Sequence, residues 1–160
     1  MSSPTVSRGV ELDTWVRFLR AHSAIVGKLN TELVADHGLT INDFEVLLHL
    51  SWAPDQAMRR VDLASSVLLT PSGITRLLDG LERSGFVARE ACATDRRVVY
   101  AKLTPAGNEK LRAARETHLA GVYRLFVERF SASELGSLYE LLERLPGVAP
   151  GEGAAEPADC

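Results

Sequence analysis

Cysteine is scarce in this chain, where only Cys92 and Cys160 occur among 160 residues. This pair forms neither a disulfide framework nor a Cys-x2-Cys metal motif, and it favours a reducing compartment. Long apolar runs are also missing, since stretches such as FEVLLHL are far shorter than the roughly 18 residues of a membrane-spanning helix. The amino-terminal MSSPTVSRGV has no apolar core of the signal-peptide type. The sequence therefore predicts a soluble, cytoplasmic protein with no membrane partner.

Catalytic signatures are missing as well. The chain has no G-x-S-x-G elbow, no phosphate-binding loop, no H-E-x-x-H and no dinucleotide fingerprint after a strand. We therefore expect neither an enzyme nor a cofactor. No metal site is expected either, because none of the histidines stand at His-x3-His spacing; they are His22, His37, His49 and His118.

The chain has the length and the hydrophobic content of one domain, with 46% hydrophobic residues. We assign that domain to residues 1–145. The remaining segment, 146–160, is rich in Pro, Gly, Ala and acidic residues and has no periodicity, which predicts a disordered tail.

Apolar spacing and capping residues predict six helices and two strands. Thr40 and Asp43 have the spacing of a capping box, and Ser131 and Glu134 repeat it. Steps of three and four residues between apolar positions indicate the helices, and short β-branched runs indicate the strands. The helices are expected at about 10–36, 40–50, 61–68, 71–83, 105–130 and 131–145, with a turn at Pro54 and strands at 86–90 and 98–103.

The segment TPSGITRLLDGLERSG is the most informative of these helices. Thr70 is a good N-cap, and Pro71 suits the first helical position because its missing N–H needs no partner there. Gly85 ends the helix. The apolar residues share one face, which leaves a polar face opposite that includes Ser72, Thr75, Arg76, Asp79 and Arg83.

This order of elements is that of a winged helix-turn-helix. We predict a mainly α fold with a small β-hairpin wing, in which residues 40–103 form the DNA-binding part. Helices 10–36 and 105–145 would form a dimerisation region, since their apolar faces are broader than one small subunit covers. The same apolar residues would alternatively form the core of a monomer.

Charge is distributed unevenly along the chain. The formal net charge is -3. Residues 59–102 nevertheless contain eight Lys or Arg against five Asp or Glu, a net charge of +3, which leaves -6 for the remainder. An anionic partner would therefore bind the middle of the chain.

The polar helix face and the wing tip together suit double-stranded DNA. An α-helix fits the major groove, and its amino end offers free N–H groups to phosphates. A hairpin beside it reaches the minor groove, whose negative potential attracts a guanidinium. Asp95 can accept a hydrogen bond from Arg97 and hold it outward. The candidate DNA contacts are Ser72, Gly73, Thr75, Arg76, Asp95, Arg96 and Arg97.

Three motifs make the chain resemble the MarR (multiple antibiotic resistance regulator) family of bacterial transcription factors. They are the D-R-R of the wing tip, the L-T-P-A-G after the second strand and the L-x-x-L-E-x-x-G that ends the recognition helix. The resemblance implies a homodimer that represses by occupying a palindrome and is released by a small ligand or an oxidant. It makes Arg97 the minor-groove arginine, Asp95 its orienting partner, and Ser72, Thr75 and Arg76 the major-groove readers.

A ligand site is suggested by the same resemblance. Trp15, Asp62 and the arginines Arg89, Arg96 and Arg97 are similar to the set used by urate-responsive and phenolic-responsive members. An indole can stack on a flat ring while an arginine binds its negative oxygen, so the expected ligand is a planar aromatic anion. Alternatively, Trp15 is an aromatic residue of the dimer core, and Asp62 is a carboxylate favoured by the helix dipole.

Two other functions stay open at this stage. Cys92 in the wing could make the protein a redox-responsive regulator, because neighbouring arginines lower a thiol pKa. The chain could also be a dimeric interaction module that does not bind DNA, although such a module would have no use for Arg97 at a wing tip.

Overall fold

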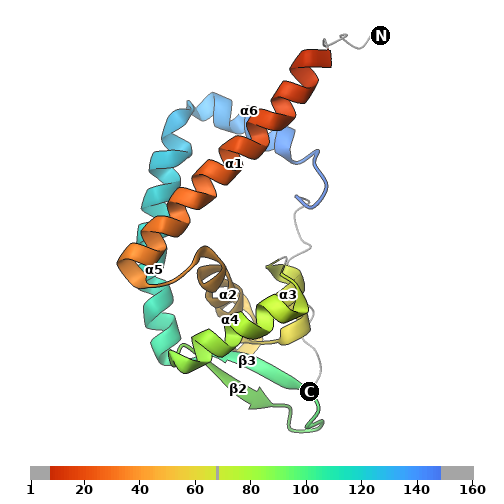
Figure 1. Ribbon diagram of the computed structural model, residues 1–160, viewed down its shortest axis with the longest axis vertical. Helices are drawn as coiled ribbons and strands as arrows, with labels where there is room; N and C mark the ends of the chain where they lie inside the picture. Colours follow the sequence, from red (N-terminus) through yellow and green to blue (C-terminus); the bar gives the residue numbers. More distant parts are fainter. Residues whose placement is uncertain (1–7, 68, 149–160) are drawn as a thin grey trace.

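A computed structural model of the protein describes residues 8–67 and 69–148 (Figure 1). Of the tail predicted at 146–160, residues 149–160 lie outside this part, as does residue 68, where the third helix was predicted to end. The helices are α1 (Arg8–His37), α2 (Ile41–Trp52), α3 (Arg60–Ser66), α4 (Pro71–Arg83), α5 (Pro105–Leu125) and α6 (Ala132–Leu142), with 3-10 turns η1 (Pro54–Gln56) and η2 (Val127–Arg129). The strands are β1 (Ala57–Arg59), β2 (Val87–Ala91) and β3 (Val99–Leu103).

Two parts of the molecule lie at opposite ends of its long axis. Helices α2, α3 and α4 pack with the small sheet in the lower half of Figure 1, and α1, the end of α5 and α6 form the upper half. This mainly helical arrangement with a β-wing confirms the predicted fold class. No helix in the described part of the chain is both long and apolar enough to cross a membrane.

Predicted helix caps account for most of the helix starts. The side chain of Thr40 accepts from the backbone N–H of Asp43, and the carboxylate of Asp43 accepts from the backbone N–H of Thr40. The predicted capping box is therefore present. Thr70 and Thr104 each accept from a backbone N–H three residues on, with proline at the first helical position. Ser131 and Glu134 form the second capping box.

The sheet has three strands rather than the two predicted. Its order is β1-β3-β2, all antiparallel, with Met58 opposite Ala101 and Arg89 opposite Ala101 on the other side. The prediction of a plain turn after α2 was therefore incomplete. Asp55 and Gln56 both have positive φ, at 53° and 55°, and this left-handed pair reverses the chain so that β1 reaches β3.

The fifth helix is shorter than the prediction of 105–130. Regular α-helix ends at Leu125, because Phe126 leaves helical geometry with φ -127° and ψ -62°. The ring of Phe126 packs edge-on against Phe130, with centroids 5.4 Å apart. The apolar spacing continues through this break, and the spacing alone therefore predicted one uninterrupted helix.

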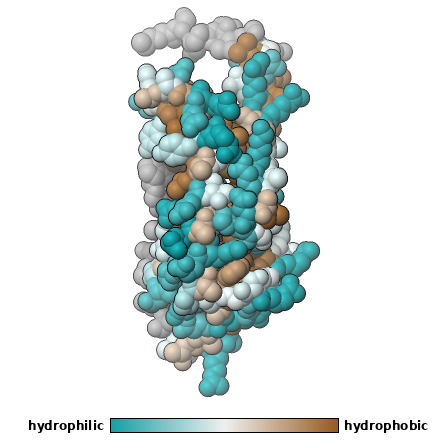
Figure 2. Space-filling view, turned by 90° about the vertical axis from the view of Figure 1, so that its left-hand side faces the viewer, coloured by the Kyte–Doolittle hydropathy of each residue, from teal (hydrophilic) through white to brown (hydrophobic). Residues whose placement is uncertain are grey.

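The hydrophobic core lies between the winged part and the nearer ends of α1 and α5. Phe44, Leu47, Leu50, Leu63 and Ile74 are at most 2% exposed. Every residue from 9 to 24 on α1 is exposed, and α6 has no buried residue. Apolar side chains accordingly reach the surface in the upper half, as Figure 2 shows for one face. The upper half of a single chain thus has little core of its own.

Candidate nucleic-acid interface

Helix α4 presents a polar face because its apolar residues are buried. Ile74 is fully buried and Leu78 is 7% exposed, both against the core. Ser72 and Arg76 are exposed on the other side, and Gly73 is half-buried where its N–H donates to Thr70 Oγ1. The amino end of α4, with its capped first turn, is therefore free to meet an anionic surface.

Thr75 is less accessible than the sequence suggested. It is half-buried, and its hydroxyl donates to the carbonyl of Pro71 at 2.9 Å. The guanidinium of Arg60, on α3, lies 3.5 Å from the same hydroxyl. Arg60 is a basic residue beside the predicted reading face that sequence reasoning did not select, although it lies within the basic segment 59–102.

The wing tip holds Arg97 in a fixed direction while leaving it open to solvent. Its backbone N–H donates to Asp95 Oδ1 at 3.0 Å, and its Nε and Nη2 donate to Oδ1 and Oδ2 of Asp95 at 3.1 and 3.3 Å. The side chain of Arg97 is nonetheless 91% exposed. The hydrogen bonds from the side chain and the backbone of Arg97 lower the pKa of Asp95. The predicted Asp95–Arg97 contact is confirmed.

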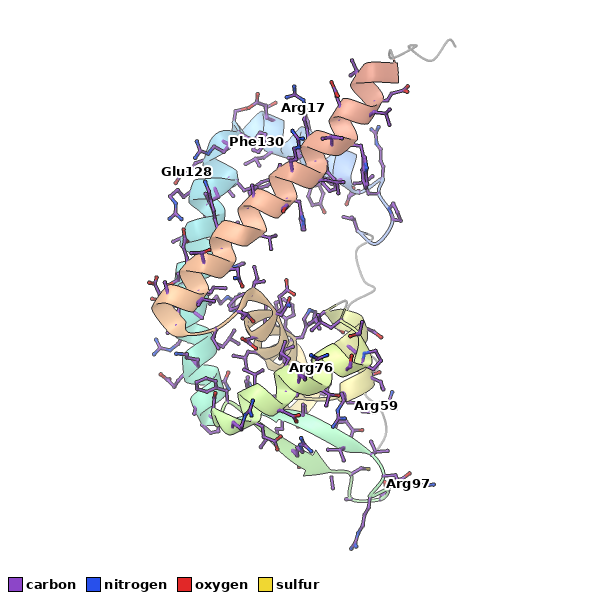
Figure 3. The ribbon with its side chains drawn as sticks, viewed as in Figure 1. Arg17, Arg59, Arg76, Arg97, Glu128 and Phe130 are labelled. Atoms are coloured by element: carbon purple, nitrogen blue, oxygen red, sulfur yellow. The ribbon has the colours of Figure 1, made fainter. Side chains whose placement is uncertain are left out.

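Arginines gather at the lower end of the molecule. Figure 3 places Arg59 at the end of β1, Arg76 on α4 and Arg97 in the wing, all at the end opposite to α6. Arg96 is exposed beside Arg97. These arginines of the basic middle segment thus lie at the same end of the molecule.

The predicted ligand residues do not meet within one chain. Trp15 is 57% exposed on the upper part of α1 and stacks on Phe18 with centroids 6.2 Å apart. Asp62 accepts from Arg59 at 2.8 Å. Arg89 forms ion pairs with two carboxylates of α4. The charged members of the set therefore already have partners from their own chain.

Cys92 lies just past β2 and is 6% exposed, with its Sγ 3.3 Å from Thr94 Oγ1.

Within residues 8–67 and 69–148, no three His, Cys, Asp or Glu side chains are grouped as they would be in a metal site.

Comparison with known proteins decides the family. The MarR family model matches residues 39–99, from just before α2 to the start of β3. An uncharacterised HTH-type transcriptional regulator of Bacillus subtilis, YkoM, is 35% identical over 68% of this chain and 69% of its own length. The chain belongs to the MarR family. It is therefore a DNA-binding transcriptional regulator of a family that is not enzymatic.

Two further relatives of this MarR protein are informative. The HTH-type transcriptional repressor YetL of Bacillus subtilis is 33% identical, over 68% of each chain. The MarR family regulator Sco3205 of Streptomyces coelicolor, whose crystal structure is a complex with DNA, has a TM-score of 0.80 at 26% identity and covers 89% of both chains. The shared fold thus extends to both the winged part and the long helices.

Proposed function

We propose that the protein is a homodimeric repressor in which α4 lies in the major groove and the wing tip enters the minor groove. Ser72, Gly73 and Arg76 would contact the major groove directly, with Thr75 held beside them. The carrying observation is Arg97, which is 91% exposed yet held by Asp95 at the tip of the wing. A guanidinium fixed in advance loses little rotamer entropy when it binds. The repressor role is supported by YetL, a relative whose name states that role.

A second copy of the chain is the proposed partner of the upper half. Helix α6 has no buried residue, although an isolated helix of this length is marginal in water. Large apolar side chains stand exposed on the same half, including Leu12 at 68% and Tyr139 at 65%. We assign dimerisation to α1, α5 and α6 and DNA contact to residues 40–103. Two recognition helices then read an inverted repeat with half-site centres about 10 bp apart.

The test begins with selection of duplexes from random-sequence DNA by the purified wild-type protein. The selected duplex should contain an inverted repeat, and Arg97→Ala should bind it more weakly while sedimenting as an unchanged dimer. Arg112→Ala is the matched control, because Arg112 is also an exposed arginine paired with a nearby carboxylate, that of Glu109. A failure of the wild type to enrich any duplex, or sedimentation as a single subunit, would contradict the proposal.

We also propose that a planar aromatic anion releases the protein from DNA, with Trp15 as the stacking group. The exposed indole of Trp15 supports this, whereas Asp62 and Arg89 would have to exchange their present partners. Titration with urate and salicylate should quench Trp15 fluorescence and weaken DNA binding. Trp15→Phe should remove the quenching and leave only the signal of Trp52. Unchanged fluorescence and DNA affinity in the wild type would rule the ligand class out.

A further inference from the structure

Arg89 connects the wing to the recognition helix. It lies in the middle of β2, and its guanidinium reaches two carboxylates on α4. Nη2 lies 2.6 Å from Asp79 Oδ1, and Nε lies 2.8 Å from Glu82 Oε2. One planar group on the sheet thus holds two side chains that stand one turn apart on the helix.

We infer that Arg89 is a positioning residue, which sets the angle of the wing relative to α4 and so places Arg97 in the minor groove. The inference rests on the proposed function, because it requires α4 and Arg97 to contact the same duplex. It gives Arg89 a role in DNA recognition in the protein without ligand.

The root of the wing is tied to Thr104 at the start of α5, and beyond it β2 is hydrogen-bonded along its length to β3. The N–H of Thr104 donates to the carbonyl of Phe86 at 3.1 Å, and the Thr104 hydroxyl donates to the carbonyl of Gly85 at 2.6 Å. Val87 is buried, whereas the other residues of β2 are exposed. Beyond Val87, therefore, apolar packing contributes little to holding β2 against the helix.

A small hollow lies between α4 and the sheet at this level. Its lining includes Leu78 and Glu82 from the helix and Val87 and Arg89 from the strand. Leu78 and Val87 are buried at this level, so α4 and β2 pack against each other on the inner side, and the ion pairs of Arg89 join them on the exposed side. These ion pairs should restrict a tilt of the wing relative to α4.

The exposure of these groups makes the inference testable without loss of the fold. The side chains of Arg89, Asp79 and Glu82 are 53%, 44% and 33% exposed. Ion pairs this exposed contribute little to the stability of the whole domain. Lysine at position 89 keeps the charge but offers a single ammonium instead of a planar fork, and it cannot hold both carboxylates in one geometry.

A purely electrostatic role is the rival explanation. Asp79 and Glu82 stand on the helix that approaches DNA, and Arg89 would merely cancel their repulsion of phosphates. The triple variant Asp79→Asn, Glu82→Gln and Arg89→Gln removes both the repulsion and the connection. Because it raises the net charge by one, it should bind at least as tightly as the wild type if only charge matters, whereas binding should be weak if position matters.

The experiment measures affinity for the duplex selected by the wild type, together with hydroxyl-radical footprints of the minor groove and dimethyl sulfate protection of the major groove. Arg89→Lys should bind on the order of fivefold more weakly than the wild type. It should lose the minor-groove footprint of the wing and keep the major-groove protection. The triple variant should give the same results. Replacing Arg97 by alanine should then cost less in the Arg89→Lys background than in the wild type, because the two residues act together. Circular dichroism should show an unchanged fold, and Arg112→Lys is the control.

Wild-type affinity and footprint in Arg89→Lys would overturn the positioning role while leaving the proposed function intact. Full recovery in the triple variant would also overturn it, in favour of charge cancellation. If the wild type itself selects no duplex, both the positioning role and the proposed function fail.

Discussion

His118 on α5 packs its ring against Phe44 on α2, with ring centroids 4.6 Å apart and planes inclined by 32°. Phe44 is 2% exposed, so the contact lies where the winged part joins the long helices. Among the described residues, Nδ1 of His118 is buried without a hydrogen-bond partner. Burial lowers the pKa of His118, which means that the folded protein favours the neutral ring.

Stability should therefore fall as the pH drops through the ordinary histidine range. Below a pH of about 6.5 the unfolded state binds the proton more readily than the folded state, so the free energy of unfolding decreases with decreasing pH. Burial lowers the pKa of His49 as well, which adds to the same trend. Urea unfolding should show that the free energy of unfolding decreases less between pH 7.5 and pH 5.5 for His118→Phe than for the wild type. An equal loss in the two proteins would exclude His118 as a cause, and His22→Phe is the exposed control.

Gly107→Ala should destabilise the protein by about 2 kcal/mol, because the new methyl group would overpack the start of α5. A Cβ at this position would lie 2.1 Å from the carbonyl oxygen of Phe86 and 2.8 Å from Leu103 Cδ1. The contact also disturbs the root of the wing. Urea unfolding checks the prediction, with Gly80→Ala as the control. A Cβ at Gly80 meets nothing within 4 Å, and alanine there should raise α4 stability by roughly 0.5–1 kcal/mol.

Asp55→Gly should stabilise the protein by up to about 1 kcal/mol. Asp55 has a φ of 53°, a left-handed conformation that glycine adopts without steric cost. Thermal unfolding should show a higher melting temperature for Asp55→Gly and a lower one for Asp55→Val, since a β-branched side chain resists this geometry. A lower melting temperature for the glycine variant would show that the aspartate side chain outweighs the backbone strain.

The salt dependence of DNA binding should distinguish residues that contact phosphates from residues that contact only bases or no DNA. If Arg97 enters the minor groove between phosphates, its replacement by alanine should reduce the slope of log affinity against log salt concentration by about 1. Fluorescence anisotropy from 50 to 300 mM KCl measures this slope. An unchanged slope would place Arg97 away from the DNA backbone.

Local signals predicted most of the helices and the geometry of the wing tip. The threonine and serine caps and the Asp95–Arg97 contact depend on residues at most three positions apart, so spacing in the sequence is sufficient to find them. The α4 bounds and its polar face follow from the same local periodicity.

Features that depend on distant partners escaped prediction. Strand β1 is only three residues long and exists because it pairs with β3, more than 40 positions later. The partners of Arg89 lie seven and ten positions away on another element, and Arg60 approaches Thr75 across 15 positions. Nothing in the residue pattern encodes these distances, because they arise from how α3, α4 and the sheet pack.

The exposed surface of α6 has a consequence for protein concentration and for the inheritance of defective copies. If the proposed dimer covers α6, this helix gains its stability from assembly, and dilution should lower the melting temperature of the protein. A subunit that keeps α1, α5 and α6 but has lost its reading surface would still assemble with intact copies. A mixed dimer that contains such a subunit would bind DNA through one subunit only and would not repress. A single defective allele would then be dominant over the normal one.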